Sequence, residues 1–217
     1  MRVYPMGLKV AERLCVVVGG GRVAERKVDS LLACGANVTV VSPDLTPELE
    51  ARAAAGEVTA FPRQFEPTDL DGAFLAIAAT DDRSVNEAVA AAALARRVLV
   101  NVVDVPELCD YYVPASFTRG ELLITVSTGG AGPALARRLR EELEGRYGPE
   151  YDAYLALIAR LRDELKSRVS SPEQRGRAMN AFLSSEALSF LREGREGDAE
   201  KLVKEYLAQA IEGETAI

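Results

Sequence analysis

A glycine-rich turn is the part of this sequence in which residue types and spacing best indicate chemistry. Gly19, Gly21 and Ala24 match the pattern G-x-G-x-x-G/A, and they follow the apolar stretch Leu14–Val18. In such a turn the first glycine permits the bend, the second lets backbone N–H groups approach a pyrophosphate, and the third small residue lets a helix pack on a strand. The pattern therefore predicts a dinucleotide site at a helix N-terminus, and the alternative is a glycine turn that binds nothing.

The residues after the next β-branched stretch bear on the choice of dinucleotide. An acidic residue about twenty positions beyond the glycines usually bonds the adenosine ribose, and here Ser42 occupies that place while Asp44 follows Pro43 slightly late. No Arg or Lys follows closely that could hold a 2′-phosphate, which favours NAD over NADP. The alternative role for Asp44 is to cap the following short helix.

Polar residues also follow two later apolar stretches. Thr80 follows the first of them, and the end of a parallel strand would place it at the ligand crevice. The alternative is that the polar residues here cap the next helix through Asp82 or Ser84, which is compatible with ligand binding by Thr80. Asn101 and Asp104 follow at the end of the next one.

Asp104 is the candidate proton acceptor because the sequence contains no histidine. Proton transfer must therefore use Asp, Glu, Lys, Tyr, Cys or a water. The alternative is that Asp104 is only a turn residue ahead of Pro106.

A second glycine loop, Ser127–Pro133, precedes a helix that contains Arg137, Arg138 and Arg140. Bare backbone N–H groups and two arginines three residues apart predict a site for a carboxylate-rich ligand. The alternative is a solvated helix whose charge is neutralised by nearby glutamates, which are Glu141, Glu142 and Glu144.

The elements that must position these residues alternate between strand and helix patterns up to about residue 112. This alternation predicts a doubly wound α/β domain with a parallel sheet. The expected strands are 14–18, 38–41, 58–61, 74–78 and 98–103, and the expected helices are 22–34, 47–55 and 84–96.

The pattern changes beyond residue 112. We expect strands at Tyr112–Val113 and Leu122–Val126, a helix over 133–144, and only helices after residue 149, with Gly194 and Gly197 separating the last one. The predicted domains are an NAD-binding Rossmann domain over 1–112, a small α+β dimerisation region over 113–147 and a helical domain over 148–217.

Composition narrows the class of protein. The 217 residues include 26 basic and 33 acidic side chains, and the net charge of −7 argues against a nucleic-acid partner. No apolar run reaches the about 18 residues that a membrane span needs. Three cysteines without C-x-x-C spacing indicate a reducing, cytoplasmic setting.

Five motifs in this order resemble the precorrin-2 dehydrogenase family, which includes the amino-terminal module of siroheme synthase. The opening residues Tyr4–Met6 with Leu8 also resemble the first strand of that family. The matching motifs are Val18–Lys27, Leu75–Asp82, Val85–Asn86, Asn101–Pro106, and Ser127–Gly130 with Pro133–Arg140.

The resemblance implies NAD-dependent oxidation of precorrin-2 to sirohydrochlorin by a homodimer, on the route to siroheme or cobalamin. Some members of the family also insert Fe²⁺, so chelation stays open. The resemblance assigns Asp104 to the chemistry, and it assigns cofactor contacts to Gly19, Gly21, Arg22, Val23, Ser42, Pro43, Asp44 and Thr80. Tetrapyrrole contacts are expected at Asn101, Ser127, Thr128, Gly129, Gly130, Arg137 and Arg140.

Two alternatives stay open. Another dehydrogenase of this fold would need a catalytic His or a Tyr-x-x-x-Lys pair, and this sequence has neither. A non-enzymatic NAD-binding regulatory module would explain the glycine turn, but not Asn101–Asp104 or the loop Ser127–Pro133.

Overall fold

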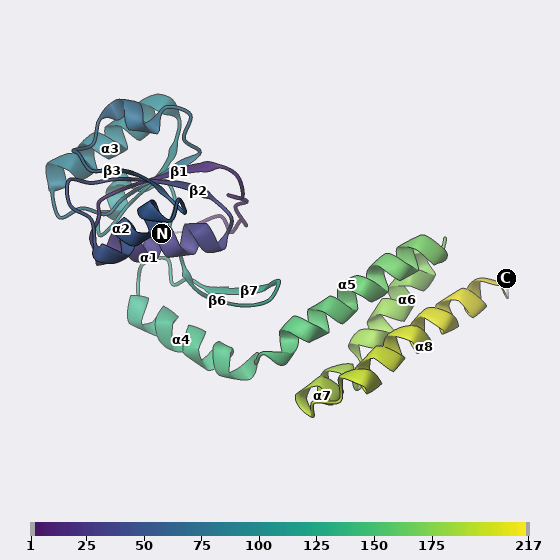
Figure 1. Cartoon of the computed structure of the whole chain (residues 1–217). Coiled ribbons are helices and arrows are strands. Elements are labelled where there is room, and N and C mark those ends of the chain that lie inside the picture. The colour runs from purple at the N-terminus through teal and green to yellow at the C-terminus, as the bar shows by residue number, and fades with distance from the viewer. Residues whose placement is uncertain (1–2, 216–217) are drawn as a thin grey trace. The chain divides into compact units, whose positions relative to one another are not determined.

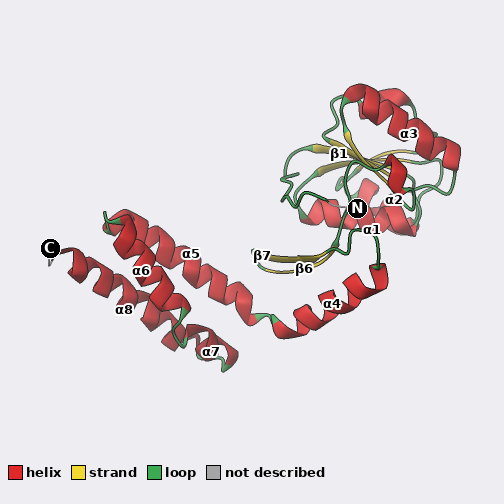
Figure 2. Cartoon of the chain, turned by 180° about the vertical axis from the view of Figure 1, so that it is seen from behind, coloured by secondary structure: helices red, strands yellow, loops and turns green. Residues whose placement is uncertain are grey.

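The computed structural model describes residues 3–215, which fold into two compact units. Tyr4–Val113 form an α/β unit, and Val3 together with the residues from Pro114 onward forms a unit with one hairpin and several helices. Figure 1 labels these elements along the chain, and Figure 2 separates helices from strands as seen from behind.

The α/β unit is built on five parallel strands in the order β3-β2-β1-β4-β5. This is the strand order of a Rossmann-type sheet, so the predicted doubly wound fold is confirmed. The strands are β1 Leu14–Val18, β2 Asn37–Val41, β3 Thr59–Phe61, β4 Leu75–Ala78 and β5 Leu99–Val102. The helices are α1 Arg22–Ala33, α2 Pro47–Ala54, α3 Arg83–Arg96 and two 3₁₀ turns, η1 Pro67–Leu70 and η2 Pro106–Leu108.

Helices cover both faces of this sheet. On one face α1 and α2 bury Ala24, Val28 and Leu49 against the strands, and on the other face α3 buries Val89 beside Leu70 of η1. Figure 1 shows α1 and α3 on opposite sides of the strands. Strands that are buried on both faces are apolar throughout, which explains why β4 has no polar residue.

The outer edge of β5 is covered by the chain that follows it. The Asp110 N–H donates to the Val100 carbonyl at 2.8 Å, and the Val100 N–H donates to the Asp110 carboxylate at 3.0 Å. Both backbone groups of Val100 on this edge are therefore satisfied without a sixth strand.

The second unit begins with an antiparallel hairpin that packs against a helix, and it continues into a helical bundle. The hairpin and α4 pack together, and the bundle is centred on Phe182, Leu161 and Leu165, which are almost fully buried. The elements are β6 Ala115–Arg119, β7 Leu122–Val126, α4 Pro133–Arg146, α5 Glu150–Arg168, α6 Pro172–Leu183, α7 Ala187–Arg192 and α8 Glu196–Thr215.

Three local predictions were wrong, and most other bounds shift by one or two residues. Tyr112–Val113 form no strand, and the first strand of the hairpin is β6, which begins at Ala115. Tyr4–Leu8 form no strand either. Gly197 lies inside α8 and does not separate it from α7, whereas Gly194 adopts a left-handed φ of 72° just after α7.

Candidate functional site

The carboxyl ends of four neighbouring strands meet in one row of the sheet. Val18 pairs with Val41 on one side and with Ala78 on the other, and Ala78 pairs with Val102. The segments that follow these residues therefore lie along one edge, which is where α/β sheets bind ligands. These segments contain the glycine turn, Ser42–Asp44, Thr80 and Asp104, so the fold brings these predicted site residues to the same edge.

The first two glycines of the turn are required by close contacts with neighbouring backbone. Gly19 has a φ of 120°, and a Cβ there would lie 2.3 Å from the Ala79 carbonyl oxygen. A Cβ on Gly20 would lie 2.0 Å from the Asp44 carbonyl oxygen and 2.9 Å from the Ser42 Oγ. The role of Gly20 was missed in the sequence, because this contact joins segments more than twenty residues apart.

Gly21 differs from its neighbours because it faces open space. A Cβ on Gly21 would meet no atom within 4 Å among the residues that the structure describes. Gly21 is also the N-cap of α1, and no side chain caps this helix. The first N–H groups of α1 are thus free of side-chain acceptors beside an open glycine, which is the arrangement that a pyrophosphate requires. The turn therefore fits the predicted dinucleotide.

The loop between β2 and α2 is bonded directly to the glycine turn. The Thr46 N–H donates to the Gly20 carbonyl at 2.9 Å, and the Thr46 hydroxyl donates to Glu25 of α1 at 2.8 Å. Thr46, not Asp44, caps α2 by accepting from the Leu49 N–H. The capping alternative for Asp44 was therefore wrong, although a threonine directly before Pro47 is a recognisable N-cap signal. Asp44 is exposed and makes no cap.

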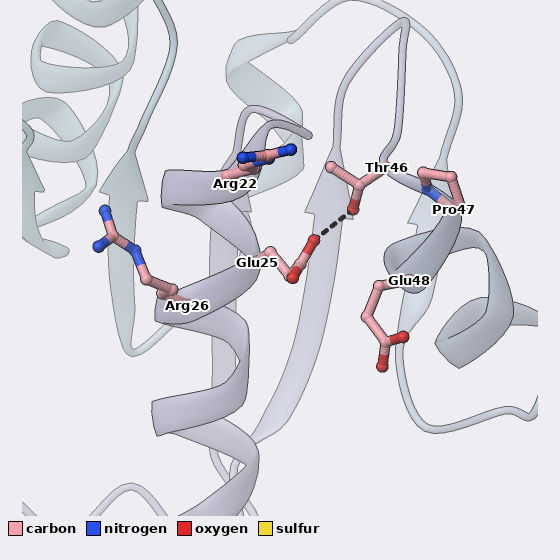
Figure 3. Close-up of a pocket in the computed structure, with 6 residues that line it drawn as sticks. All are labelled: Arg22, Glu25, Arg26, Thr46, Pro47 and Glu48. Atoms are coloured by element: carbon pink, nitrogen blue, oxygen red, sulfur yellow. Dashed lines mark hydrogen bonds between the residues drawn. The ribbon is translucent and has the colours of Figure 1, made fainter.

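An open hollow of about 640 Å³ lies between the N-terminal turns of α1 and the start of α2. Figure 3 shows Glu25 and Thr46 pointing toward one another across it, whereas Arg26 points to the other side of α1. The hollow borders Arg22, one of the predicted cofactor residues, and its lining residues are Arg22, Glu25, Arg26, Thr46, Pro47 and Glu48.

Thr80 is held in place by the start of α3. Its hydroxyl lies 3.0 Å from the Asn86 Oδ1, and the Asn86 amide donates back to the Thr80 carbonyl at 3.0 Å. Asp82 caps α3, as one alternative predicted, and hydrogen bonds from the Ser84 hydroxyl and from the Ser84 and Val85 N–H groups lower the pKa of Asp82. Capping and a cofactor contact are compatible at this strand end, because they involve different residues.

Asn101 is one of three buried polar residues in the described part of the chain and has a structural partner. Its amide donates to the Tyr111 carbonyl at 3.0 Å, which ties β5 to the chain that returns along its edge. Cys109 adds to this tie, since its Sγ lies 3.2 Å from both the N and the O of Val102. Burial raises the pKa of the neighbouring Tyr111 hydroxyl. The sequence did not reveal this support of the β5 end.

The side chain of Asp104 does not take part in this packing. Asp104 has a left-handed φ of 60°, a conformation that Asp tolerates better than most residues, and its side chain is exposed. Within residues 3–215 its carboxylate makes no hydrogen bond and no ion pair. The carboxylate is therefore not used to stabilise the turn before Pro106, and it can accept a proton.

The predicted tetrapyrrole residues beyond Asn101 all lie in the second unit. In the glycine loop the Ser127 and Thr128 side chains accept hydrogen bonds from the Gly129 and Gly132 N–H groups, at 3.2 and 3.1 Å. Gly130 has a left-handed φ of 86° and open space around it.

The two arginines differ in their surroundings. Arg140 is paired with Glu144 and Glu141, as the alternative of a neutralised helix predicted. Arg137 is exposed and has no ion pair within the part of the chain that the structure describes. Arg137 is thus the available cation of the pair.

Residues 6–115, half of the chain, match the family described as "Putative NAD(P)-binding". Residues 119–146 match "Sirohaem biosynthesis protein central", and residues 150–207 match "Sirohaem synthase dimerisation region". The three matches follow one another along almost the whole sequence.

The chain belongs to the family that includes the amino-terminal module of siroheme synthases.

The relatives agree with this assignment. The chain is 47% identical to a siroheme synthase of Methylobacillus flagellatus over 81% of its own length and 38% of that protein. It is 39% identical to that of Thioalkalivibrio sulfidiphilus over 98% of its length and 43% of that protein. The chain thus spans about two fifths of the siroheme synthases that it matches.

A solved structure named "SirC, precorrin-2 dehydrogenase" superimposes on the chain with a TM-score of 0.77 at 26% identity. The superposition covers 94% of this chain and 100% of that one. The family and the fold inferred from the sequence motifs are therefore confirmed.

No cluster of three or more His, Cys, Asp or Glu side chains within residues 3–215 could hold a metal ion. No helix in this range is both long enough and apolar enough to cross a membrane.

Proposed function

We propose that this chain oxidises precorrin-2 to sirohydrochlorin with NAD, in the synthesis of siroheme. The observation that carries the proposal is the single edge at which an uncapped helix N-terminus, an open glycine and an unpaired carboxylate come together. The whole-length superposition on a precorrin-2 dehydrogenase and the siroheme synthase relatives support the choice of substrate.

The proposed cofactor site uses mainly backbone groups. Gly19, Gly21, Arg22 and Val23 would hold the pyrophosphate, and the loop Ser42–Asp44 would hold the adenosine ribose. Thr80 would contact the nicotinamide side from the end of β4. When bound, NAD supplies the acceptor for the hydride, and the protein supplies position and exclusion of competing reactions.

Asp104 is the proposed proton acceptor. Dehydrogenation removes a hydride and a proton from the macrocycle, and a carboxylate that makes no other hydrogen bond can take that proton directly or through a water. Because the sequence has no histidine, no imidazole competes for this role. The same free carboxylate disfavours the alternative of a regulatory module, because a module that only binds NAD needs no proton acceptor.

Arg137 and the loop Ser127–Gly130 are the proposed contacts for the carboxylates of the macrocycle, whereas Asn101 is a weaker candidate because it is buried and its amide already donates to the Tyr111 carbonyl. Arg140 is a weaker candidate, because two glutamates already neutralise it. The Gly129 and Gly132 N–H groups already donate within the loop, so a local cation such as Arg137 is what would let an acidic protein bind an anionic substrate.

We also propose a homodimer and a cytoplasmic location, supported by the dimerisation-region match and by three unpaired cysteines. Iron insertion is a second candidate function because the relatives are siroheme synthases. Fe²⁺ would then be a substrate, and adding it to sirohydrochlorin together with the protein tests this step. If iron insertion is no faster than the uncatalysed reaction, dehydrogenation is the one activity that remains proposed.

The decisive experiment supplies enzymatically made precorrin-2 and NAD and follows the absorbance of sirohydrochlorin. Asp104→Ala should lower kcat by about 100-fold or more while the Kd for NAD stays within about twofold. Asp104→Asn is the matched control for the left-handed backbone, since Asn also tolerates it. Absence of turnover by folded wild-type protein would refute the proposed reaction, and normal turnover by both variants would refute the role of Asp104.

Arg137 allows a separate test of the substrate site. Arg137→Ala should raise the KM for precorrin-2 by roughly tenfold and leave the Kd for NAD unchanged, because a lost charge-assisted hydrogen bond weakens binding alone. Arg138→Ala, an exposed arginine on the same helix, is the control. If both variants have the same KM as the wild type, Arg137 does not bind the carboxylates of the substrate.

A further inference from the structure

Phe61 and Arg63 lie at the carboxyl end of β3, next to the predicted cofactor residues. Phe61 ends β3 and pairs with Val41, the last residue of β2, so it belongs to the same edge of the sheet as the glycine turn. The Phe61 carbonyl accepts hydrogen bonds from the Ser42 N–H at 3.2 Å and from the Arg63 N–H at 2.8 Å. One carbonyl oxygen therefore joins the backbone of Arg63 to Ser42, where the ribose is proposed to bind.

The Arg63 guanidinium is held in one orientation. Its two terminal nitrogens donate to the two carboxylate oxygens of Asp69 at 2.9 and 2.5 Å, and one of them also donates to the Gln64 carbonyl at 2.9 Å. The Asp69 side chain is only 6% exposed. A bidentate pair of this kind fixes the plane of the guanidinium and neutralises its charge. Arg63 is therefore a rigid flat group and not a free cation.

Arg63 and Phe61 together offer a flat surface to solvent. The Arg63 Cζ lies 5.2 Å from the centroid of the Phe61 ring, which is within the range of a cation–π contact. The Arg63 side chain is still 39% exposed, and Phe61 is 41% exposed. An exposed aromatic ring in contact with a guanidinium plane is the kind of surface on which nucleic-acid bases stack.

The strand order gives the direction in which the cofactor would run. β1, β2 and β3 are consecutive neighbours in the sheet, and β1 ends at the glycine turn that is proposed for the pyrophosphate. β2 ends at the loop Ser42–Asp44, which is proposed for the adenosine ribose. In NAD this ribose joins the pyrophosphate to the adenine. The base is therefore expected one strand beyond the ribose, at the end of β3.

We propose that Phe61 and Arg63 form the platform on which the adenine of NAD stacks. The inference rests on the cofactor site proposed above, and it adds the base to the contacts with pyrophosphate and ribose. Because Asp69 already neutralises Arg63, the platform holds the base by stacking and does not attract a further phosphate group.

The first test compares NAD with nicotinamide mononucleotide, which has no adenine. Arg63→Ala should raise the Kd for NAD by about tenfold and change the Kd for the mononucleotide by less than about twofold, because only the base loses its contact. Isothermal titration measures both values. An equal rise in Kd for the two ligands would overturn the platform, because the substitution would then act on the whole site.

A matched control removes another ion pair from the same unit. Arg96 is the last residue of α3 and pairs with Asp71 at 2.6 Å. Arg96→Ala should leave the Kd for NAD unchanged, since this pair lies at the C-terminal end of α3 and not at the edge that contains the glycine turn. An effect on NAD binding as large as that of Arg63→Ala would attribute the loss to a destabilised fold and overturn the platform.

The second test leaves the ion pair between Arg63 and Asp69 in place. Phe61→Leu should raise the Kd for NAD by roughly fivefold, and Phe61→Tyr, which keeps the ring, should bind NAD more tightly than Phe61→Leu. If the two variants bind NAD equally well, the ring has no part in binding and the platform is overturned.

The outcomes also separate this inference from the proposal on which it rests. If the wild type does not bind NAD, the cofactor site and the platform both fail. If the wild type binds NAD and Arg63→Ala binds it with the same Kd, the cofactor site stands and only the platform is overturned.

Discussion

At the scale of single residues, three consecutive glycines have different structural requirements. A side chain on Gly19 or Gly20 would overlap the carbonyl oxygen of a neighbouring loop, whereas one on Gly21 would enter open space. The first two glycines therefore hold the loops of the site together, and the third keeps room for a ligand.

This difference gives a paired prediction. Gly20→Ala should lower the stability of the α/β unit by about 2 kcal/mol or more, because the Asp44 backbone must move. Gly21→Ala should leave stability within about 0.5 kcal/mol and weaken NAD binding by roughly tenfold, because the added methyl group occupies the space beside the helix N-terminus. Urea unfolding and titration with NAD measure the two effects. Equal stability losses in the two variants would contradict this division of roles.

The sequence predicted the residues of the edge but not their mutual contacts. Gly19, Gly21 and Asp104 are recognisable because a local pattern marks them. Gly20 and Thr46 are not, since their roles depend on contacts between the glycine turn and the β2–α2 loop. The free carboxylate of Asp104 also required the structure, because a turn aspartate and a reactive aspartate look the same in sequence.

At the scale of elements, the connection from β3 to β4 is fixed by an ion pair that the sequence did not predict. Arg63 donates to Asp69 at 2.5 Å, and the Asp69 side chain is only 6% exposed. Asp69 also accepts from the Glu66 N–H at 2.8 Å, which closes a capping box around η1. The hydrogen bond from Arg63, together with that from Glu66, lowers the pKa of Asp69.

The lowered pKa gives a pH-dependent prediction. A carboxyl whose pKa is depressed by folding adds stability above its unfolded pKa of about 3.9, and this stability is lost as pH falls through the folded value. Asp69→Asn should therefore lower the urea midpoint of the α/β unit by about 0.5 M between pH 5 and 8, and the difference should shrink below about pH 4. Glu57→Gln, at an exposed pair with Arg52, is the control. A difference that does not change with pH would exclude the ion pair as its cause.

The elements that sequence patterns missed are those whose state depends on distant partners. Tyr112–Val113 have strand-forming side chains, but they precede Pro114, and the edge of β5 is already occupied by Asp110. Tyr4–Leu8 have the alternation of a strand but no partner strand within the described chain. Local propensity identifies a candidate strand, but pairing decides whether it forms.

At the scale of the whole molecule, the chain has separate hydrophobic cores. The α/β unit has one core on each face of its sheet, and the helices from α5 onward have their own core around Phe182. Units with separate cores can unfold in separate transitions.

Calorimetry should therefore show two transitions with different sensitivities. Phe182→Ala should destabilise only the helical unit, by about 3–5 kcal/mol, because it empties the centre of that core. NAD at about 100 times its Kd should stabilise only the α/β unit, by about 2.7 kcal/mol. A single transition that responds to both changes would show that the units unfold together.

The strand order β3-β2-β1-β4-β5 also has a consequence for the growing chain on the ribosome. β1 is synthesised first and lies in the centre, and each later strand joins an edge that already exists. No strand has to be inserted between two others, so the nascent sheet can grow outward as the chain emerges. Asp110 then closes the last edge within a few residues of β5. By this order the sheet is complete before the hairpin and the helical bundle have been made.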